Sequence, residues 1–518
     1  MSSQIMVKNR TKAVPLGLMV PVILLVLLTS LPLLYIIIRA QEAGWNHAMS
    51  LIFRARVYQL LLNTLQLLAV VTVLSTLIGV TTAWLLERTD VPKRKIWNAL
   101  VTLPFAVPAF ISSYSWISLL PQLEGFGGAV LVLTLCNYPL VHLPVAAALR
   151  GMDPALEETS RSLGFNRTQT FFKVILPQLR PALYGGAILI ALHMLAEFGA
   201  LAFLNYETFT TAIFDQYYVA FDGASAAMLT LVLLLLCLMV IGLELLLRGK
   251  ANYAIERKGS PGMQQLIKLG WCKPLAVLGL MALVALAAGV PLGIISFWLL
   301  NGTSSAFHGQ AVWSALTTTL SFGFGGALLA IVFALPLVFL AVRYQGRLSM
   351  MAERLPYLIH SLPGLVIGLT LVFFAIRYAF PFYQTSPLLL IGYAMLYLPL
   401  AQSSIRAALI QVSTQIEEMA RSLGKSALSV FMRITLPLIA PGVGAGLALV
   451  FLQIMKELTA TLLLRPTGVD TLATKVWEHT ANAEYGASAP YAALLIVVSG
   501  LPVYLLTMRS FTRNTAHA

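Results

Sequence analysis

The chain has 518 residues, of which 58% are hydrophobic and only 10% are charged, and its formal net charge is +14. Soluble domains carry about 25% charged residues, so this composition excludes a soluble globular enzyme. The basic residues fall between apolar stretches and do not form one stripe interleaved with aromatics, which argues against a nucleic-acid partner.

Twelve apolar stretches of about 20 residues follow one another, each long enough to cross a bilayer core of about 30 Å. They are residues 14–38, 58–86, 97–121, 128–149, 182–204 and 225–247 in the first half, and 274–300, 313–342, 355–376, 387–405, 441–463 and 489–508 in the second. The sequence therefore predicts an all-α polytopic membrane protein of two six-helix halves. Prolines inside these stretches, such as Pro104, Pro108, Pro139, Pro363 and Pro399, are expected to break or kink their helices.

Orientation in the membrane follows from the lysines and arginines. With the N-terminus inside, 27 of the 34 basic residues fall on the cytoplasmic side, so both termini are predicted to be cytoplasmic. The first outer loop is an exception, because it contains Arg39, Arg54 and Arg56. The first stretch is too long for a signal-peptide core and lacks a small-residue cleavage site, so we expect a retained anchor.

Two polar segments, at residues 156–182 and 416–442, are copies of one another. They align without gaps at an offset of 260 residues and share ten of 27 positions. The same offset pairs Pro139 with Pro399. The chain is therefore an internal duplication, and its halves have the same topology because an even number of spans separates equivalent points. The pseudo-two-fold axis is expected to run along the membrane normal.

Each copy has the pattern of two short helices joined at a glycine. Glu417 and Arg421 form an i, i+4 pair in the favourable order, and Gly424 is predicted to end that helix in a left-handed conformation. An apolar stripe that includes Leu428 and Phe431 follows. A paired docking surface is the favoured interpretation. The alternative is an amphipathic loop on the lipid surface, but such helices usually have Lys/Arg-rich polar faces.

The copies resemble a pattern of the membrane subunits of bacterial ABC importers, E-A-A-x3-G-x9-I-x-L-P. The second copy fits it at Glu418, Gly424 and 434–437. The first fits with Glu158 and Gly164, but has Thr-Ser in place of the two alanines and Val in place of Ile. The resemblance implies the type I importer permease fold. It also implies that the first loop (residues 151–181) and the second loop (residues 409–441) dock on ATP-hydrolysing subunits.

The coupling residues implied by this resemblance occupy matching places in the two loops. They are Glu157, Glu158, Arg161, Gly164, Phe171 and Pro177 in the first loop, and Glu417, Glu418, Arg421, Gly424, Phe431 and Pro437 in the second. Gly424–Ser426 spells the end of a phosphate-binding loop, but Met419 stands where that motif needs glycine. The chain is therefore expected to bind no cofactor and to catalyse no reaction.

The expected complex contains one permease chain in the bacterial inner membrane and two copies of a cytoplasmic ATPase, which use ATP and Mg. A periplasmic or surface-tethered binding protein delivers the substrate, and the remaining contacts are with membrane lipid. The predicted domains are an N-terminal segment at 1–57, transmembrane domains at 58–247 and 313–508, a linker at 248–273, a seventh helix with its outer loop at 274–312, and a cytoplasmic tail at 509–518.

The cargo is suggested by two matching segments. Lys456–Thr480 and Ala196–Tyr217 resemble ferric-iron importer permeases, although thiamine, phosphonate and polyamine permeases share much of this pattern. From a different class, an ion-coupled secondary transporter would need buried charge relays and no repeated docking segment. The few charges inside the spans disfavour it.

Glu197 and Glu457 occupy equivalent places near the outer ends of the fifth and eleventh spans. Ionisable groups at this depth usually face a cavity or a partner, so these two carboxylates either line or gate the pathway or brace the helices. No confident metal ligands are identified. The outer loop at 205–224 has three acidic residues and no basic ones, which suits attraction of cations or docking of a binding protein.

Overall fold

The computed structural model describes residues 14–248, 266–302, 309–344, 346–360 and 362–515. Over these ranges the elements are helices, with one isolated β-bridge between Thr89 and Ile267. This confirms the all-α class. Most of the predicted linker, the first 13 residues of the N-terminal segment and the last three of the tail lie outside the described residues.

Among the described residues, each of the twelve predicted stretches contains helix, but only nine to eleven of them qualify as membrane spans by length and composition. Nine are long and apolar enough to cross a membrane, two more are bent pairs, and Tyr485–Gly500 supplies a shorter apolar helix. The principal helices are α1 (Leu16–Ala43), α3 (Ala55–Arg88), α6 (Phe126–Asn137), α7 (Pro139–Arg150), α10 (Leu176–Ala196), α13 (Gly223–Arg248), α14 (Lys273–Val284), α15 (Val290–Asn301), α16 (Gly309–Arg343), α19 (Ser386–Gln411), α22 (Leu436–Met455) and α25 (Tyr485–Thr515).

The third and ninth spans are bent. The helices that run to Ala106 and on from Ala109 (α5, Ala109–Leu119) meet at 91°, and α17 (Arg347–His360) and α18 (Gly364–Tyr378) meet at 110°. Pro108 and Pro363 stand directly before the second helix of each pair, in an extended conformation with ψ of 142° and 149°. Proline disfavours helix at the residue before it, and Val107 is extended with ψ of 119°. The predicted breaks at Pro108 and Pro363 are confirmed, whereas Pro399 lies inside the unbroken helix α19.

The chain folds into two compact units, each discontinuous in sequence. Unit 1 contains residues 1–39 and 314–471, and unit 2 contains residues 40–313 and 472–518. In unit 1, Tyr35 of α1 packs edge-on against Phe373 of α18, with ring centroids 5.3 Å apart. Arg39 lies 4.9 Å from the same centroid. The predicted domains are continuous in sequence and place α1 in an N-terminal segment before the first half. In the structure, α1 packs in the same unit as helices of the second half.

A cluster of tightly packed helices forms the centre of each unit: α3, α7 and α10 in unit 2, and α19 with α22 in unit 1. Small residues allow this approach. A Cβ on Gly186 of α10 would meet Val141 of α7 at 2.9 Å, and one on Gly446 of α22, the equivalent position, would meet Ser404 of α19 at 3.1 Å. Close backbone approach of this kind is the usual basis of helix packing in membranes.

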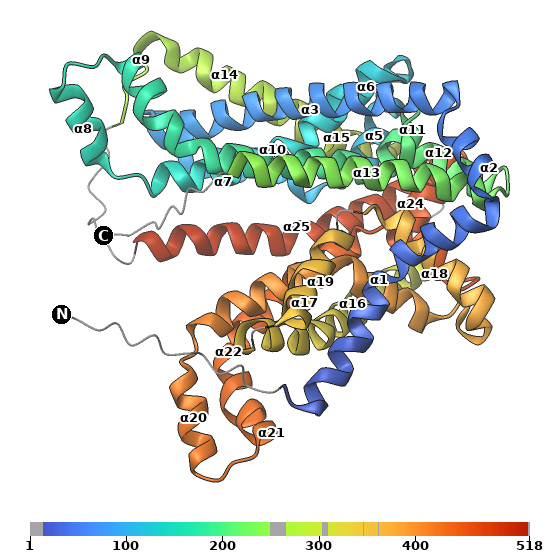
Figure 1. The fold of residues 1–518 in the computed structure, drawn as a ribbon. Helices are drawn as coiled ribbons and strands as arrows, with labels where there is room; N and C mark the ends of the chain where they lie inside the picture. The colour runs from blue at the N-terminus through green and yellow to red at the C-terminus, as the bar shows by residue number, and fades with distance from the viewer. Residues whose placement is uncertain (1–13, 249–265, 303–308, 345, 361, 516–518) are drawn as a thin grey trace. The chain divides into compact units, whose positions relative to one another are not determined.

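The polar loops lie at one end of these clusters. In Figure 1, α8 and α9 lie at one end of unit 2, and α11 and α12 lie at the opposite end. In unit 1, α20 and α21 extend from one end of α22. We call these the loop ends of the two units.

Candidate functional site

Each polar loop has one short helix, as predicted, but its second helix is not separate: it continues through a π-helical turn into the long helix α10 or α22, over Thr168–Ala196 and Ala427–Met455. In the first loop α8 (Pro154–Ser162) is followed by α9 (Arg167–Thr170), and in the second α20 (Thr414–Ser422) is followed by α21 (Ala427–Val430). Asp153 accepts a hydrogen bond from the Ala155 amide and Ser413 from that of Gln415, so both first helices are capped by a side chain at their N-termini.

The two helices of each loop are separated by a glycine in the left-handed region. Gly164 has φ +84° and Gly424 has φ +81°, which confirms the predicted helix end. In the second loop the Lys425 amide donates to the carbonyl of Ala420 at 3.2 Å, five residues back, the pattern of a Schellman turn. A Cβ at either glycine would meet nothing within 4 Å. Glycine is therefore needed for the backbone conformation and not for space.

The first glutamate of each loop points inward. Glu157 pairs with Arg88 of α3, with Oε1 and Nη1 2.6 Å apart. Glu417 pairs with Arg343 of α16 at 3.0 Å. The predicted surface pair between Glu417 and Arg421 is wrong, because the Glu417 side chain is only 7% exposed and turns toward α16.

The two arginines were missed in the sequence because they are not related by the 260-residue offset. Arg88 and Arg343 are 255 residues apart, whereas Glu157 and Glu417 are 260 apart. A usable signal exists, since each arginine is the last residue of a long apolar helix, the second span of the first half and of the second half.

The second glutamate and the following arginine of each loop face outward. Glu158 and Arg161 are exposed in the first loop, as are Glu418 and Arg421 in the second. Large apolar side chains are exposed beside them: Leu156, Leu163 and Phe172 in the first loop, and Ile416, Met419, Leu423, Leu428 and Met432 in the second. Contiguous exposed apolar surface rimmed by charge is typical of interaction sites.

The predicted apolar stripe extends into the π-helical turns Phe171–Ile175 and Phe431–Thr435 and divides between two faces. Phe171 packs edge-on against Trp84 of α3 with centroids 5.0 Å apart, and Phe431 packs against Phe339 of α16 at 5.5 Å. These two rings therefore hold the loops against their units, while their neighbours Phe172 and Met432 are exposed. Pro177 and Pro437 lie in the first turns of α10 and α22.

Glu197 and Glu457 lie at breaks that follow α10 and α22. Glu197 accepts a hydrogen bond from the Ala200 amide at 3.0 Å. Glu457 accepts one from the Ala460 amide at 2.9 Å and one from the Tyr397 hydroxyl at 2.7 Å. Each carboxylate thus satisfies an amide in the first turn of the next short helix, α11 (Gly199–Phe203) or α23 (Thr459–Leu464). His193 lies 3.8 Å from Glu197.

An open hollow of about 710 Å³ lies in unit 2 at the end opposite the loop end. Aromatic rings line it, with Phe203 stacked on Trp477 of α24 (Leu472–Ala481) at 4.7 Å. Three carboxylates also line it: Glu124, Glu207 and Asp215. Among the residues that the structure describes, no group of three His, Cys, Asp or Glu side chains is placed to hold a metal ion.

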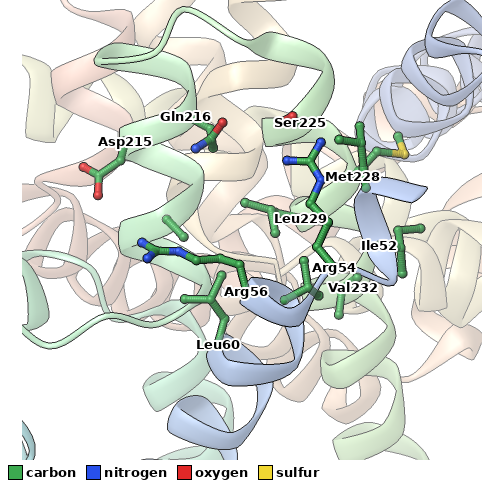
Figure 2. Close-up of a pocket in the computed structure, with 13 residues that line it drawn as sticks. Ile52, Arg54, Arg56, Leu60, Asp215, Gln216, Ser225, Met228, Leu229 and Val232 are labelled. Atoms are coloured by element: carbon green, nitrogen blue, oxygen red, sulfur yellow. The ribbon is translucent and has the colours of Figure 1, made fainter. Parts of the chain in front are cut away.

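A smaller cavity of about 70 Å³ is lined by Arg54 and Arg56, two of the arginines that make the first outer loop unexpectedly basic (Figure 2). Arg56 pairs with Glu207 at 2.8 Å, and in Figure 2 it reaches toward Asp215 while Arg54 reaches toward Ser225. Burial and the neighbouring Glu207 raise the pKa of Asp215, and Arg56 opposes them. The acidic segment thus supplies a counterion for at least one of these arginines.

Comparison with known proteins identifies the family. A family described as the binding-protein-dependent transport system inner membrane component matches residues 75–251 and 338–513, together more than half of the chain. Each match contains one of the two loops. The chain belongs to this family. The duplicated architecture of this permease is therefore that of two fused family domains.

The named relatives are permease proteins of transport systems. A Fe(3+)-transport system permease protein of Haemophilus influenzae is 44% identical over 96% of this permease and 99% of its own length. A ferric transport system permease protein of Actinobacillus pleuropneumoniae is 27% identical over 84% of the permease and 69% of its own length. A sulfate transport system permease protein of Salmonella typhimurium is 29% identical over 34% of the permease.

Proposed function

We propose that this permease carries ferric iron across the bacterial inner membrane, with ATP hydrolysed by partner subunits. The observation that carries the proposal is the 44% identity to a Fe(3+)-transport permease along nearly the whole of both chains. The sulfate permease, by contrast, matches only about a third of the chain.

The two polar loops are the proposed contacts with the ATPase. Both place a glutamate, an arginine and a leucine on the surface in the same order, and the leucines, Leu163 and Leu423, are 71% and 80% exposed. Two matching surfaces suit two copies of one ATPase subunit, which would use ATP and Mg. The distribution of basic residues supports a cytoplasmic location for both loops and both termini.

The opposite end of unit 2 is the proposed side of substrate entry from a binding protein. The carboxylates around the 710 Å³ hollow attract cations to this face. Glu197 and Glu457 retain two proposed roles, in the pathway or as braces of their helices. Their bonds to backbone amides support the second.

Reconstitution tests the proposal. The purified permease, placed in vesicles with its own ATPase and binding protein, is expected to import ferric iron only with ATP, and thiamine or polyamines are expected neither to stimulate ATP turnover nor to compete. Stimulation by thiamine without stimulation by iron would overturn the iron assignment.

In the same vesicles, Glu197→Gln with Glu457→Gln lowers iron transport at unchanged thermal stability if the carboxylates line the pathway. If the double variant instead loses thermal stability while transport per ATP is unchanged, the two carboxylates brace their helices.

Sidedness is tested by cysteine labelling. With exposed Cys272 replaced by serine, a cysteine at Ser422 is expected to react only from the cytoplasmic side and one at Thr467 only from outside. The opposite pattern would place the loops on the wrong side for an ATPase.

A further inference from the structure

Arg88 ties three parts of the first loop region together. Its Nη1 pairs with Glu157 of α8, while its Nη2 lies 3.4 Å from the Leu149 carbonyl near the end of α7 and 3.3 Å from the sulfur of Met152. The arginine side chain is only 5% exposed. One guanidinium thus joins the end of α3, the end of α7 and the first helix of the loop.

Arg343 makes the matching set of contacts in unit 1. Its Nη2 lies 3.4 Å from the Leu409 carbonyl and 3.0 Å from that of Val412, and it pairs with Glu417 at 3.0 Å. Leu409 and Val412 stand 260 residues after Leu149 and Met152. The contacted positions are therefore equivalent, although the arginines themselves are shifted by five residues in sequence.

We propose that Arg88 and Arg343 are positioning residues that fix the two polar loops rigidly to the membrane helices. We call each arginine, its glutamate and its carbonyl contacts a clamp. The inference rests on the proposed coupling role of the loops. It gives the two glutamates of each loop different roles. The second glutamate, Glu158 or Glu418, faces the ATPase, whereas the first glutamate holds the loop in place.

The physical reason lies in the shape and chemistry of the arginine side chain. A guanidinium offers five donors in a fixed fork and stays charged, so it can hold a carboxylate and carbonyl oxygens at once. The Leu149 and Leu409 carbonyls lie in the last turns of α7 and α19, and this end of a helix carries partial negative charge. A loop fixed at its first helix in this way moves with α3 or α16 as one body when it is pushed.

The test compares four single variants in reconstituted vesicles: Arg88→Ala, Arg343→Ala, Arg88→Lys and Arg343→Lys. Each alanine variant is expected to bind the ATPase normally and to lower substrate transported per ATP by about 10-fold to 100-fold, the upper value being what a misplacement of about 1 Å can cost. Lysine keeps the ion pair but not the fork, so it restores part of this ratio. A ratio within about twofold of the parent in the lysine and alanine variants alike would overturn the proposal.

A second measurement does not depend on transport. Spin labels at Ser162 and Ser422, both exposed, are expected to become more mobile in the corresponding arginine variants when no ATPase is present. Unchanged mobility of the labels would contradict the clamp, even in a variant whose folding is impaired. Leu163→Asp with Leu423→Asp serves as the control for the proposed function. If the leucine double variant still binds the ATPase, the loops are not the docking surface. If it loses binding but the arginine variants keep the parent's transport per ATP, the clamp alone is rejected.

Discussion

The two polar loops have the same backbone conformation but differ in the contact between their two helices. In the first loop the hydroxyls of Ser160 and Thr170 form a buried hydrogen bond of 2.9 Å. In the second loop, Ala420 and Val430 occupy the same positions and are buried as apolar side chains. The clamp to the membrane helices is ionic in both loops. The contact between the two helices of a loop can therefore be either a hydrogen bond or an apolar contact, whereas the attachment of the loop to its unit is an ion pair in both loops.

The strongest test of equivalence between the loops is at their glycines. Proline requires φ near −65°, so Gly164→Pro and Gly424→Pro cannot keep the observed turn and also lose an amide that donates to Arg161 or Arg421. Each single variant is expected to reduce ATP-dependent uptake in vesicles to background. The alanine variants at the same positions strain the backbone by only about 1–2 kcal/mol and serve as controls. Loss of uptake in one proline variant alone would show that one loop suffices.

The glutamates of the two clamps differ in their contacts, which predicts different costs for their removal. Glu417 also accepts a hydrogen bond from Thr435 at 3.1 Å, while the equivalent position in the first loop is Ile175, and the Glu157 side chain is 17% exposed. Removal of either glutamate leaves a buried arginine without its carboxylate, which costs about 3–5 kcal/mol, and Glu417→Ala also leaves the buried Thr435 hydroxyl without this acceptor. Glu157→Ala is expected to cost less. Unfolding in detergent by circular dichroism measures both, and equal losses would contradict the comparison.

Sequence reasoning was most successful where one residue determines a local conformation. The left-handed glycines and the breaks at Pro108 and Pro363 depend only on backbone sterics. The direction of Glu417 could not be predicted, because i, i+4 spacing says nothing about Arg343, which is 74 residues away in sequence. Likewise, Phe171 and Phe172 are adjacent, and only packing against Trp84 decides which one faces inward. Charge and helix periodicity describe a segment, whereas burial depends on the neighbouring helices.

The internal contact offers a smaller and sharper test. Ser160→Ala leaves the buried hydroxyl of Thr170 without its partner and is expected to cost about 1–3 kcal/mol. Ser160→Ala combined with Thr170→Val copies the second loop and is expected to be nearly neutral, because both polar groups leave together. A double-mutant cycle on thermal unfolding measures the difference. A double variant that is less stable than the single one would show that the two loops are not interchangeable here.

The smallest effect is expected in the segment between α3 and the following helix, Arg94–Thr102. Asp90 accepts hydrogen bonds from Lys273 at 2.7 Å and from the Leu269 amide at 2.9 Å. Both contacts, with Lys273 first, lower the pKa of Asp90 from its ordinary 3.8. Its contribution to stability is therefore present above pH 3.8 and is lost as the pH falls through the lower folded pKa.

Asp90→Asn keeps an acceptor for Leu269 but loses the ion pair with Lys273. The variant is expected to be slightly less stable than the parent at pH 7, and the difference is expected to disappear in acid, at about pH 2. Thermal unfolding at both pH values measures this. A difference that grows in acid would contradict the assigned direction of the pKa.

The contact between α1 and α18 has a consequence for the order of biosynthesis. The ribosome completes α1 roughly 330 residues before Phe373, which at about 5–20 residues per second is an interval of about 15–65 s. During that time α1 is in the bilayer before the ring that Tyr35 packs against has been made. Unit 1 therefore cannot close during early translation. A nascent chain that stops short of α18 retains an anchor helix without its packing partner.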